Sequence, residues 1–297
     1  MVDSLKRNEQ SKSDSQAFGR ALTLLKKSPE TIVGFFVVAL FMLTGIIVTI
    51  SDLVGIRITP YNPIQQNVGI ALSAPSWDHL FGCDFLGRDV FSRVIASIPN
   101  DVAVSFCVVF VAIIVGALLG SLAGFKGGLL DELLMRFTDV IFSLPVLVIA
   151  MVIAVALGPG LTHMMIAMMV IWWPPYARMA RGESLRVAHQ NFIEAARFAG
   201  QRTIGILFKH VLPNISITML VYATLDVGTV ILVYAGLSYL GLSVRPPLPD
   251  LGEMISSSQD YLITAPWLPI IPGAVIAIIV IGFSVLGDGI RDALEAR

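Results

Sequence analysis

Six apolar stretches limit what this chain can fold into. A helix needs about 20 mainly apolar residues to cross a bilayer, and six stretches approach this length: residues 31–50, 102–125, 140–157, 161–177, 215–239 and 262–287. Only 14% of the residues are charged, whereas a soluble domain carries about 25%. We therefore expect an all-α polytopic membrane protein with six transmembrane helices.

The fourth stretch is the least regular of the six. It contains Trp172 and Trp173, followed directly by Pro174 and Pro175. Proline lacks the N–H that a helix interior needs, and its ring clashes with the preceding turn. The double proline is therefore expected to kink or end this helix.

Lysine and arginine are distributed unevenly between the connections. Cytoplasmic connections of membrane proteins carry an excess of these residues. When the N-terminus is placed inside, 16 of the 20 basic residues fall on the cytoplasmic side and 4 on the external side. Both chain ends are therefore predicted to be cytoplasmic. The polar start of the chain also lacks the early apolar stretch of a cleavable signal peptide.

The predicted organisation has five parts. They are a cytoplasmic tail (1–30), a first transmembrane helix (31–50), an external loop (51–100), a five-helix core (101–290) and a cytoplasmic C-terminus (291–297). The core is expected to include two short cytoplasmic helices at residues 191–210.

These short helices lie in an unusually polar segment, NFIEAARFAGQRTIGILFKHVLPN, residues 191–214. Asn191, followed by Glu194 three residues later, resembles a capping box and predicts a helix that starts at Phe192. Four of its residues recur at helical spacing and share one face. They are Phe192, Ala195, Ala196 and Ala199. A face composed mostly of alanine permits close approach to another helix or backbone.

Gly200 marks the expected turn after this helix, because glycine adopts the left-handed conformation that ends many helices. A second short helix is predicted from about Arg202, and Pro213 is expected to close it before the next span. By pattern alone, the two helices could lie at the lipid surface or could receive a partner protein.

The segment also carries a motif. EAARFAG, followed nine residues later by HVLP, resembles the EAA loop of bacterial ABC importer permeases, with His210 at the usual isoleucine position. The matching residues are Glu194, Ala195, Ala196, Gly200, Leu212 and Pro213. The resemblance implies that these residues, together with Ala199, form coupling helices that sit in a groove of an ATPase subunit.

Further motifs resemble the dipeptide, oligopeptide and nickel group of the same permeases. HLFGCDFLGRDVFSR (79–93) is similar to the external segment before the second span, with Cys83 at a threonine position. After Arg93, VIASIPNDV departs from the usual continuation. GLSYLGLSVRPPLPDLGEMI, APWLPIIPG and LGDGIRDAL resemble the last external loop, the sixth span and the C-terminal signature.

The resemblance implies a fold, a function and partners. The fold would be the type I ABC importer permease core, and the chain would be the second, C-type permease that forms half of a path for di- or oligopeptides by alternating access. A second homologous permease, two ATPase subunits that bind ATP and Mg, and an external substrate-binding protein would complete the complex in the bacterial inner membrane. Nickel or a metal chelate is the alternative substrate.

The chain itself offers no site for chemistry. It has no G-x-x-x-x-G-K-[ST] phosphate loop, so energy is expected from another subunit. We expect no enzyme activity, no cofactor, no bound metal and no nucleic-acid partner. The run THMMIAMM (162–169) has the residue types of a soft-metal path, but methionine is also a common filler of apolar helix bundles.

Four charged residues are candidates for contact with substrate or partner. Asp226 is the one carboxylate well inside an apolar run, and such a residue by default indicates a transport path or a buried pairing. If Asp226 lies in a transport path, the chain could instead be an ion-coupled secondary transporter. A membrane scaffold without transport is another alternative to the permease. On the external side, Arg245, Asp250 and Glu253 are candidates for contact with the binding protein.

Overall fold

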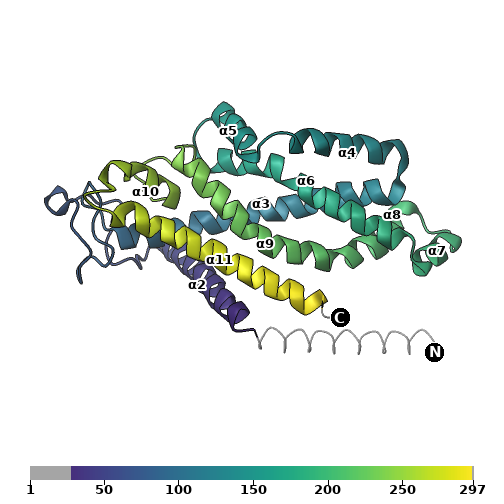
Figure 1. Ribbon diagram of the computed structural model, residues 1–297, viewed down its shortest axis with the longest axis horizontal. Coiled ribbons are helices and arrows are strands. Elements are labelled where there is room, and N and C mark those ends of the chain that lie inside the picture. Colours follow the sequence, from purple (N-terminus) through teal and green to yellow (C-terminus); the bar gives the residue numbers. More distant parts are fainter. Residues whose placement is uncertain (1–27, 296–297) are drawn as a thin grey trace.

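The described part of the chain folds mainly into helices (Figure 1). The computed structural model describes residues 28–295, so residues 1–27 of the predicted tail and residues 296–297 lie outside the described part. In chain order the elements are α2 (Pro29–Val54), η1 (Val68–Ile70), α3 (Val90–Lys126), α4 (Gly128–Phe142), α5 (Val146–Leu157), α6 (Leu161–Ala188), α7 (Asn191–Phe198), α8 (Thr203–Ile206), the π-helix η2 (Leu207–Val211), α9 (Leu212–Tyr239), α10 (Leu251–Ser257), η3 (Gln259–Tyr261) and α11 (Trp267–Glu295).

Within residues 28–295, four helical stretches are long and apolar enough to cross a membrane. They are Pro29–Val54, Val90–Lys126, Thr203–Tyr239 and Trp267–Leu294. A fifth crossing results if α4 and α5 together form one broken span. The all-α class and the membrane-spanning character are thus confirmed, whereas the number of six spans is not. α6 contains the predicted fourth span, and its histidine, tryptophan, proline and arginine residues lower its hydropathy.

The predicted third span, 140–157, is wrong as a single helix. The chain breaks at Ser143–Pro145, and α4 and α5 meet there at an angle of 87°. Proline disfavours helical geometry in the residue before it, and Pro145 caps the new helix instead of continuing the old one. Most of the chain between the predicted second and third spans, residues 126–139, is also helix, as part of α4.

α3 begins well before the predicted second span. It starts at Val90, because the carboxylate of Asp89 accepts a hydrogen bond from the backbone N–H of Ser92 at 2.7 Å. Such a cap satisfies an N–H that has no partner within the helix. The last part of the predicted external loop 51–100 is therefore helical.

α6 continues through Pro174 and Pro175, so the two prolines do not end this helix. α6 packs closely along α3, where Gly116, Gly120 and Gly124 form one face. A Cβ atom added at any of the three would overlap the backbone of α6. Small residues at this spacing let helices in membranes approach closely.

The order of the other helices follows from similar close contacts. Gly289 near the end of α11 lies against Thr31 at the start of α2, and Gly287 lies against Leu225 of α9. α9 and α11 are antiparallel, because Gly228 further along α9 meets Val280 earlier in α11. α10 lies at the opposite end of the molecule from α7 and α8, and α11 starts near α10 and ends short of α7 (Figure 1).

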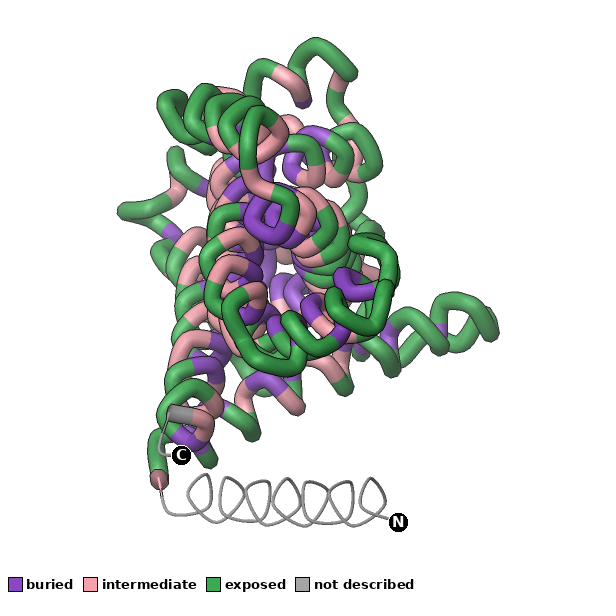
Figure 2. Tube along the Cα trace, turned by 90° about the vertical axis from the view of Figure 1, so that its right-hand side faces the viewer, coloured by how far each residue is buried: buried purple, intermediate pink, exposed green. Residues whose placement is uncertain are grey.

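Burial separates the centre of the bundle from its surface. Figure 2 shows the buried residues collected between the helices and exposed residues around them. The exposed residues include many large apolar side chains on the outer faces of the spans, such as Phe36, Leu40 and Ile281. A contiguous apolar surface of this kind indicates contact with membrane or with other proteins.

Candidate functional site

The segment that carries the EAA motif forms the far end of the bundle. Residues 191–213 are called the EAA segment here. α7 begins at Asn191 itself, and Gln190 occupies the cap position without a side-chain hydrogen bond, so the predicted capping box is wrong. Ile193 and Ala196 are buried, and Arg197 stacks over the ring of Phe125 at the end of α3, 5.0 Å from its centroid.

Gly200 makes the turn between the two short helices, as predicted. Its φ is +74°, a conformation that other residues adopt at a cost. The N–H of Gly200 donates to the carbonyl of Arg197 at 3.0 Å, and the N–H of Gln201 donates to that of Ala196 at 3.1 Å. These two bonds form a Schellman motif, which fixes the angle at which the chain leaves α7.

The second short helix does not end before the next span. α8 continues through η2 into α9, so one helical stretch extends from Thr203 to Tyr239. The expectation that Pro213 closes the short helix is therefore wrong, because Pro213 lies in the first turn of α9. Proline lacks an N–H, and its ring crowds the carbonyl four residues earlier. For Pro213 this is the carbonyl of Lys209, which lies within the wider π turn at residues 207–211.

The outer face of the EAA segment is uncovered and carries large apolar side chains among charged ones. Its exposed large side chains are Phe192, Phe198, Ile204 and Phe208, of which Phe198 is 91% exposed. Among the alanines of the predicted docking face, Ala195 and Ala199 are exposed and Ala196 points inward. Glu194 and Gly200 are exposed as well. Most of the motif is thus accessible to another protein, whereas Leu212 and Pro213 belong to the start of α9.

Asp226 is buried in the bundle and paired with α6. Its Oδ2 accepts hydrogen bonds from the Trp172 indole N–H at 2.6 Å and from the Tyr176 hydroxyl at 2.9 Å. The sequence left two interpretations of Asp226, as part of a transport path or as one partner of a buried pair. The structure shows it hydrogen-bonded to two buried side chains. Tyr176 also packs edge-on against Tyr222, with ring centroids 5.1 Å apart.

Tyr222 connects this cluster to a groove. The groove has a volume of about 540 Å³ and lies between α6, α9 and α11 towards the EAA segment. Tyr222, Met179 and Leu225 contribute to its walls, and Arg186 and Arg291 also line it. Asp226 therefore lies one side chain behind the wall of an amphipathic groove, not in the groove itself.

The three candidates for binding-protein contact lie at the α10 end and differ in their surroundings. Arg245 is exposed. Asp250 is buried and caps α10, since its carboxylate accepts hydrogen bonds from the backbone N–H groups of Gly252 at 3.0 Å and Glu253 at 3.3 Å. Glu253 is partly buried and pairs with Arg93. Of the three, only Arg245 is free of these internal contacts.

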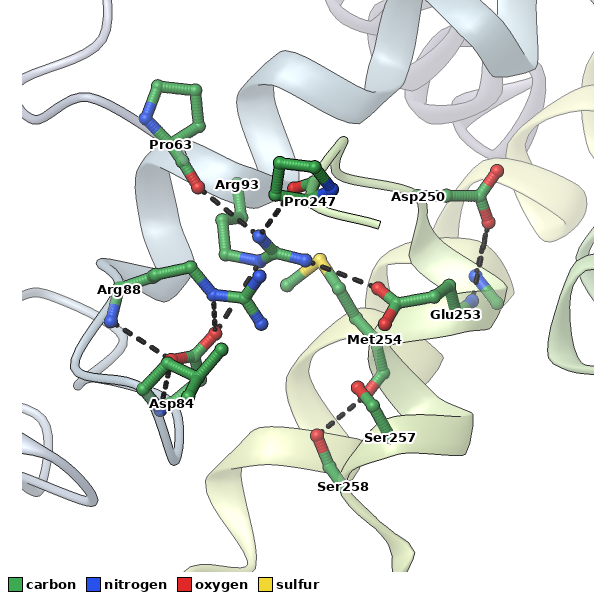
Figure 3. A network of polar contacts seen from close by, with 12 residues as sticks. Pro63, Asp84, Arg88, Arg93, Pro247, Asp250, Glu253, Met254, Ser257 and Ser258 are labelled. Carbon is green, nitrogen blue, oxygen red and sulfur yellow. Dashed lines mark hydrogen bonds and ion pairs between the residues drawn. The ribbon is translucent and has the colours of Figure 1, made fainter. Parts of the chain in front are cut away.

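Arg93 is the centre of a polar network that joins three segments (Figure 3). Its guanidinium pairs with the carboxylate of Glu253 at 3.2 Å and lies 3.7 Å from Oδ2 of Asp84. It also donates to the carbonyls of Pro63 at 3.2 Å and Pro247 at 3.3 Å. The network fastens the loop before α3 to α10 across the end of the bundle.

Burial changes the acid–base properties of this end. It raises the pKa of Glu253 above its usual value, while Arg93 acts in the opposite direction. Burial, together with the nearby carboxylates of Asp89 and Asp84, raises the pKa of the Cys83 thiol to about 11. Cys83 is therefore a neutral thiol near pH 7. Within residues 28–295 no group of three or more metal-ligating side chains occurs.

The network yields a first prediction. Arg93→Met removes the cation and leaves Glu253 without its partner, whereas Asp84 keeps its ion pair with Arg88 at 2.6 Å. Removing one partner of a buried pair costs about 3–5 kcal/mol. We expect a lower thermal unfolding midpoint for the purified protein in detergent. Arg245→Met, at an exposed arginine of the same end, is the matched control and should leave the midpoint unchanged. Equal midpoints for both variants would contradict the role given to Arg93.

Three comparisons extend these observations. The sequence model of one protein family, described as "Binding-protein-dependent transport system inner membrane component", matches residues 116–297. The dipeptide transport system permease protein DppC of Alkalihalophilus pseudofirmus is 35% identical over 277 residues, which cover 93% of this chain and 89% of the relative. The glutathione transport system permease protein GsiD of Shigella flexneri is 40% identical over 225 residues, 76% of this chain and 74% of the relative.

Proposed function

Because the chain belongs to the family of binding-protein-dependent transport system inner membrane components, we propose that it is one of two permease subunits of an ATP-driven peptide importer. Permeases of this kind do not catalyse a reaction. A second homologous permease would complete the path, two ATPase subunits would supply energy with bound ATP and Mg, and an external binding protein would deliver the substrate.

One observation carries the proposal for this chain. The part of the EAA segment that carries the exposed side chains of Ile204 and Phe208 is joined without a break to a span, because α8, η2 and α9 are one helical stretch, and α7 is attached to it through the turn at Gly200. A force applied to α7 and α8 would therefore move α9 and the wall residue Tyr222 with it. Coupling by such rigid elements is a common way to switch between two states.

The topology of the proposal follows the distribution of basic residues. Both chain ends and the EAA segment would be cytoplasmic, and the α10 end would be external. Six crossings result if α4 with α5 is the third span and α6 the fourth. The groove between α6, α9 and α11 is then the candidate for this subunit's part of the path, and Asp226 supports its wall through Tyr176 and Tyr222.

The substrate class rests on the relatives. Their names specify a dipeptide and glutathione, and both are short peptides. We therefore propose a short peptide as the substrate of the importer that contains this chain.

The test is purification of the tagged chain from its native membrane in a gentle detergent, with mass spectrometry of the proteins that accompany it. We expect a second permease and ATPase subunits. Recovery of the chain alone, in good yield, would contradict the proposal and favour an ion-coupled transporter.

A matched pair of variants sharpens this test. Phe198→Asp places a charge on the exposed face of α7, and we expect it to lose the ATPase subunits and keep the second permease. Ile263→Asp makes the same kind of change at an equally exposed position near the opposite end, where Ile263 is 94% exposed. It should keep both, and loss of the ATPases from both variants would contradict docking at the EAA segment.

A further inference from the structure

A polar stripe runs along the buried side of α3. Arg93, Ser97, Asp101 and Ser105 are spaced four residues apart, so they share one face of the helix, and all four are buried. The two serines bond locally, since Ser97 donates to the carbonyl of Val94 at 2.8 Å and Ser105 to that of Asp101 at 2.6 Å. Arg93 has its partners in the network at the α10 end. Asp101 is the exception.

Asp101 has no hydrogen-bond partner for either carboxylate oxygen, and its side chain lies in the interior with the residue only 2% exposed. No ion pair to Asp101 occurs within residues 28–295. An ionised carboxylate in such a place has neither water nor a cation to offset its loss of hydration. Nearly all buried polar groups have a partner, so this one requires an explanation.

Among the residues that the structure describes, none of the titratable groups that face Asp101 is a cation. Asp101 interacts electrostatically with Asp250, which caps α10, and with the hydroxyl of Tyr234 on α9. Neither brings a positive charge. The nearest cation on its own helix face, Arg93, is engaged by Glu253 and Asp84. A second carboxylate close by disfavours a second negative charge.

A metal ion does not fit this place. A hard cation needs about six oxygen ligands, and the carboxylate of Asp250 is already fully used. Its Oδ1 accepts from Ser238 and from two backbone N–H groups, and its Oδ2 accepts from Tyr234 and Ser243. Asp101 alone would have to hold the ion. The ligand that one isolated carboxylate can hold is a proton.

We infer that Asp101 is a proton-binding site, that the proton is bound in the conformation described here, and that its loss weakens the contact of α3 with α9 and α10. The unfolded chain releases this proton near pH 4, as an ordinary aspartate does. The folded protein therefore holds one proton more than the unfolded chain at neutral pH. By linkage, stability falls as the pH rises towards the value at which Asp101 ionises.

If the proposed function holds, protonation of Asp101 is linked to opening of the α10 end during transport. Opening of the α10 end to the outside would admit water to Asp101 and favour release of its proton. Closure would require the proton to bind again. An alkaline external medium is therefore expected to favour the open state.

Infrared spectroscopy of the intact transporter in lipid nanodiscs tests the binding site without relying on transport. A protonated carboxylic acid has a C=O stretching band that a carboxylate lacks. We expect such a band at neutral pH, its loss in Asp101→Asn, and its persistence in Asp226→Asn, the matched change at another buried aspartate. A band that survives in Asp101→Asn and disappears in Asp226→Asn would overturn the inference.

Stability provides a second readout. If the native side chain is neutral, Asp101→Asn and Asp101→Leu should both accumulate like the wild type. The unfolding midpoint of the wild type should fall more steeply with rising pH than that of Asp101→Asn. Failure of both neutral variants to assemble, or parallel pH profiles for the wild type and Asp101→Asn, would show that the native side chain is charged and would overturn the inference.

Discussion

Gly120→Leu is expected to abolish accumulation of folded protein. Gly120 lies at the middle of the glycine face of α3, where an added Cβ would overlap the carbonyl of Ala177 in α6. Backbone cannot move aside as the end of a flexible side chain can, so the two helices must separate. Separation would remove the close contact between α3 and α6. The measurement is the amount of monodisperse protein in detergent, by fluorescence-detected size exclusion.

A matched pair of alanine variants separates close packing from a general effect of replacing glycine. Alanine favours a helix by about 1 kcal/mol relative to glycine, whereas overpacking costs about 1–3 kcal/mol or more. At Gly236 in α9, an added Cβ would meet only a side-chain carbon of Leu147, at 3.9 Å. We expect Gly120→Ala to lower the unfolding midpoint and Gly236→Ala to leave it unchanged or raise it. A Gly120→Ala protein as stable as the wild type would contradict the packing described here.

The glycine face of α3 can be found in the sequence by its spacing, but its partner helix cannot. GALLGSLAG contains three glycines four residues apart, the spacing typical of close helix contacts in membranes. What the sequence does not contain is the partner of that face. α6 packs against α3, about 60 residues earlier in the chain, and the local effect of the two prolines predicted a kink or an end without reference to this contact.

The EAA segment was predicted in its main features because its determinants are local. Gly200 adopts the left-handed conformation, and α8 begins at Thr203, next to the predicted Arg202. The details failed where two local rules competed. Asn191 could cap a helix or belong to its first turn, and Pro213 could end one helix or begin the next; the chain takes the second course in both cases.

The polar interior was the part least accessible to sequence reasoning. The residue type and burial of Asp226 could be expected, but its donors lie 54 and 50 residues away. Arg93 and Glu253 are 160 residues apart. The sequence placed Glu253 and Asp250 on an external loop as candidates for partner contact. Asp250 followed three residues later by Glu253 is the pattern of a helix start and indicates α10. Nothing in the local pattern indicates Arg93 as the partner of Glu253.

Gly200→Pro is expected to separate ATP hydrolysis from transport while leaving membrane insertion intact. The φ of Gly200 is +74°, and proline is fixed near −65°, so the Schellman turn cannot form. α7 would then leave α8 at a different angle, and the face that includes Phe198 would no longer match the ATPase. Substrate uptake and ATP hydrolysis are measured in the same proteoliposomes. We expect uptake to fall to background while hydrolysis continues. The same result is expected for Glu194→Lys, which reverses a charge on the exposed part of α7.

Two further variants distinguish the turn from a general disturbance of the segment. Asparagine tolerates the left-handed conformation better than other non-glycine residues, so Gly200→Asn should retain most of the uptake. Gly205→Ala changes a glycine in α8 that has open space around it and should retain all of it. Normal uptake by Gly200→Pro and Glu194→Lys would show that the EAA segment does not transmit the force. Loss of uptake in Gly205→Ala as well would show that the surface of α8, and not the turn at Gly200, is what the ATPase requires. The decisive comparison is thus Gly200→Pro against Gly200→Asn, because these two differ in the backbone geometry they allow at the single position that sets the angle between α7 and α9.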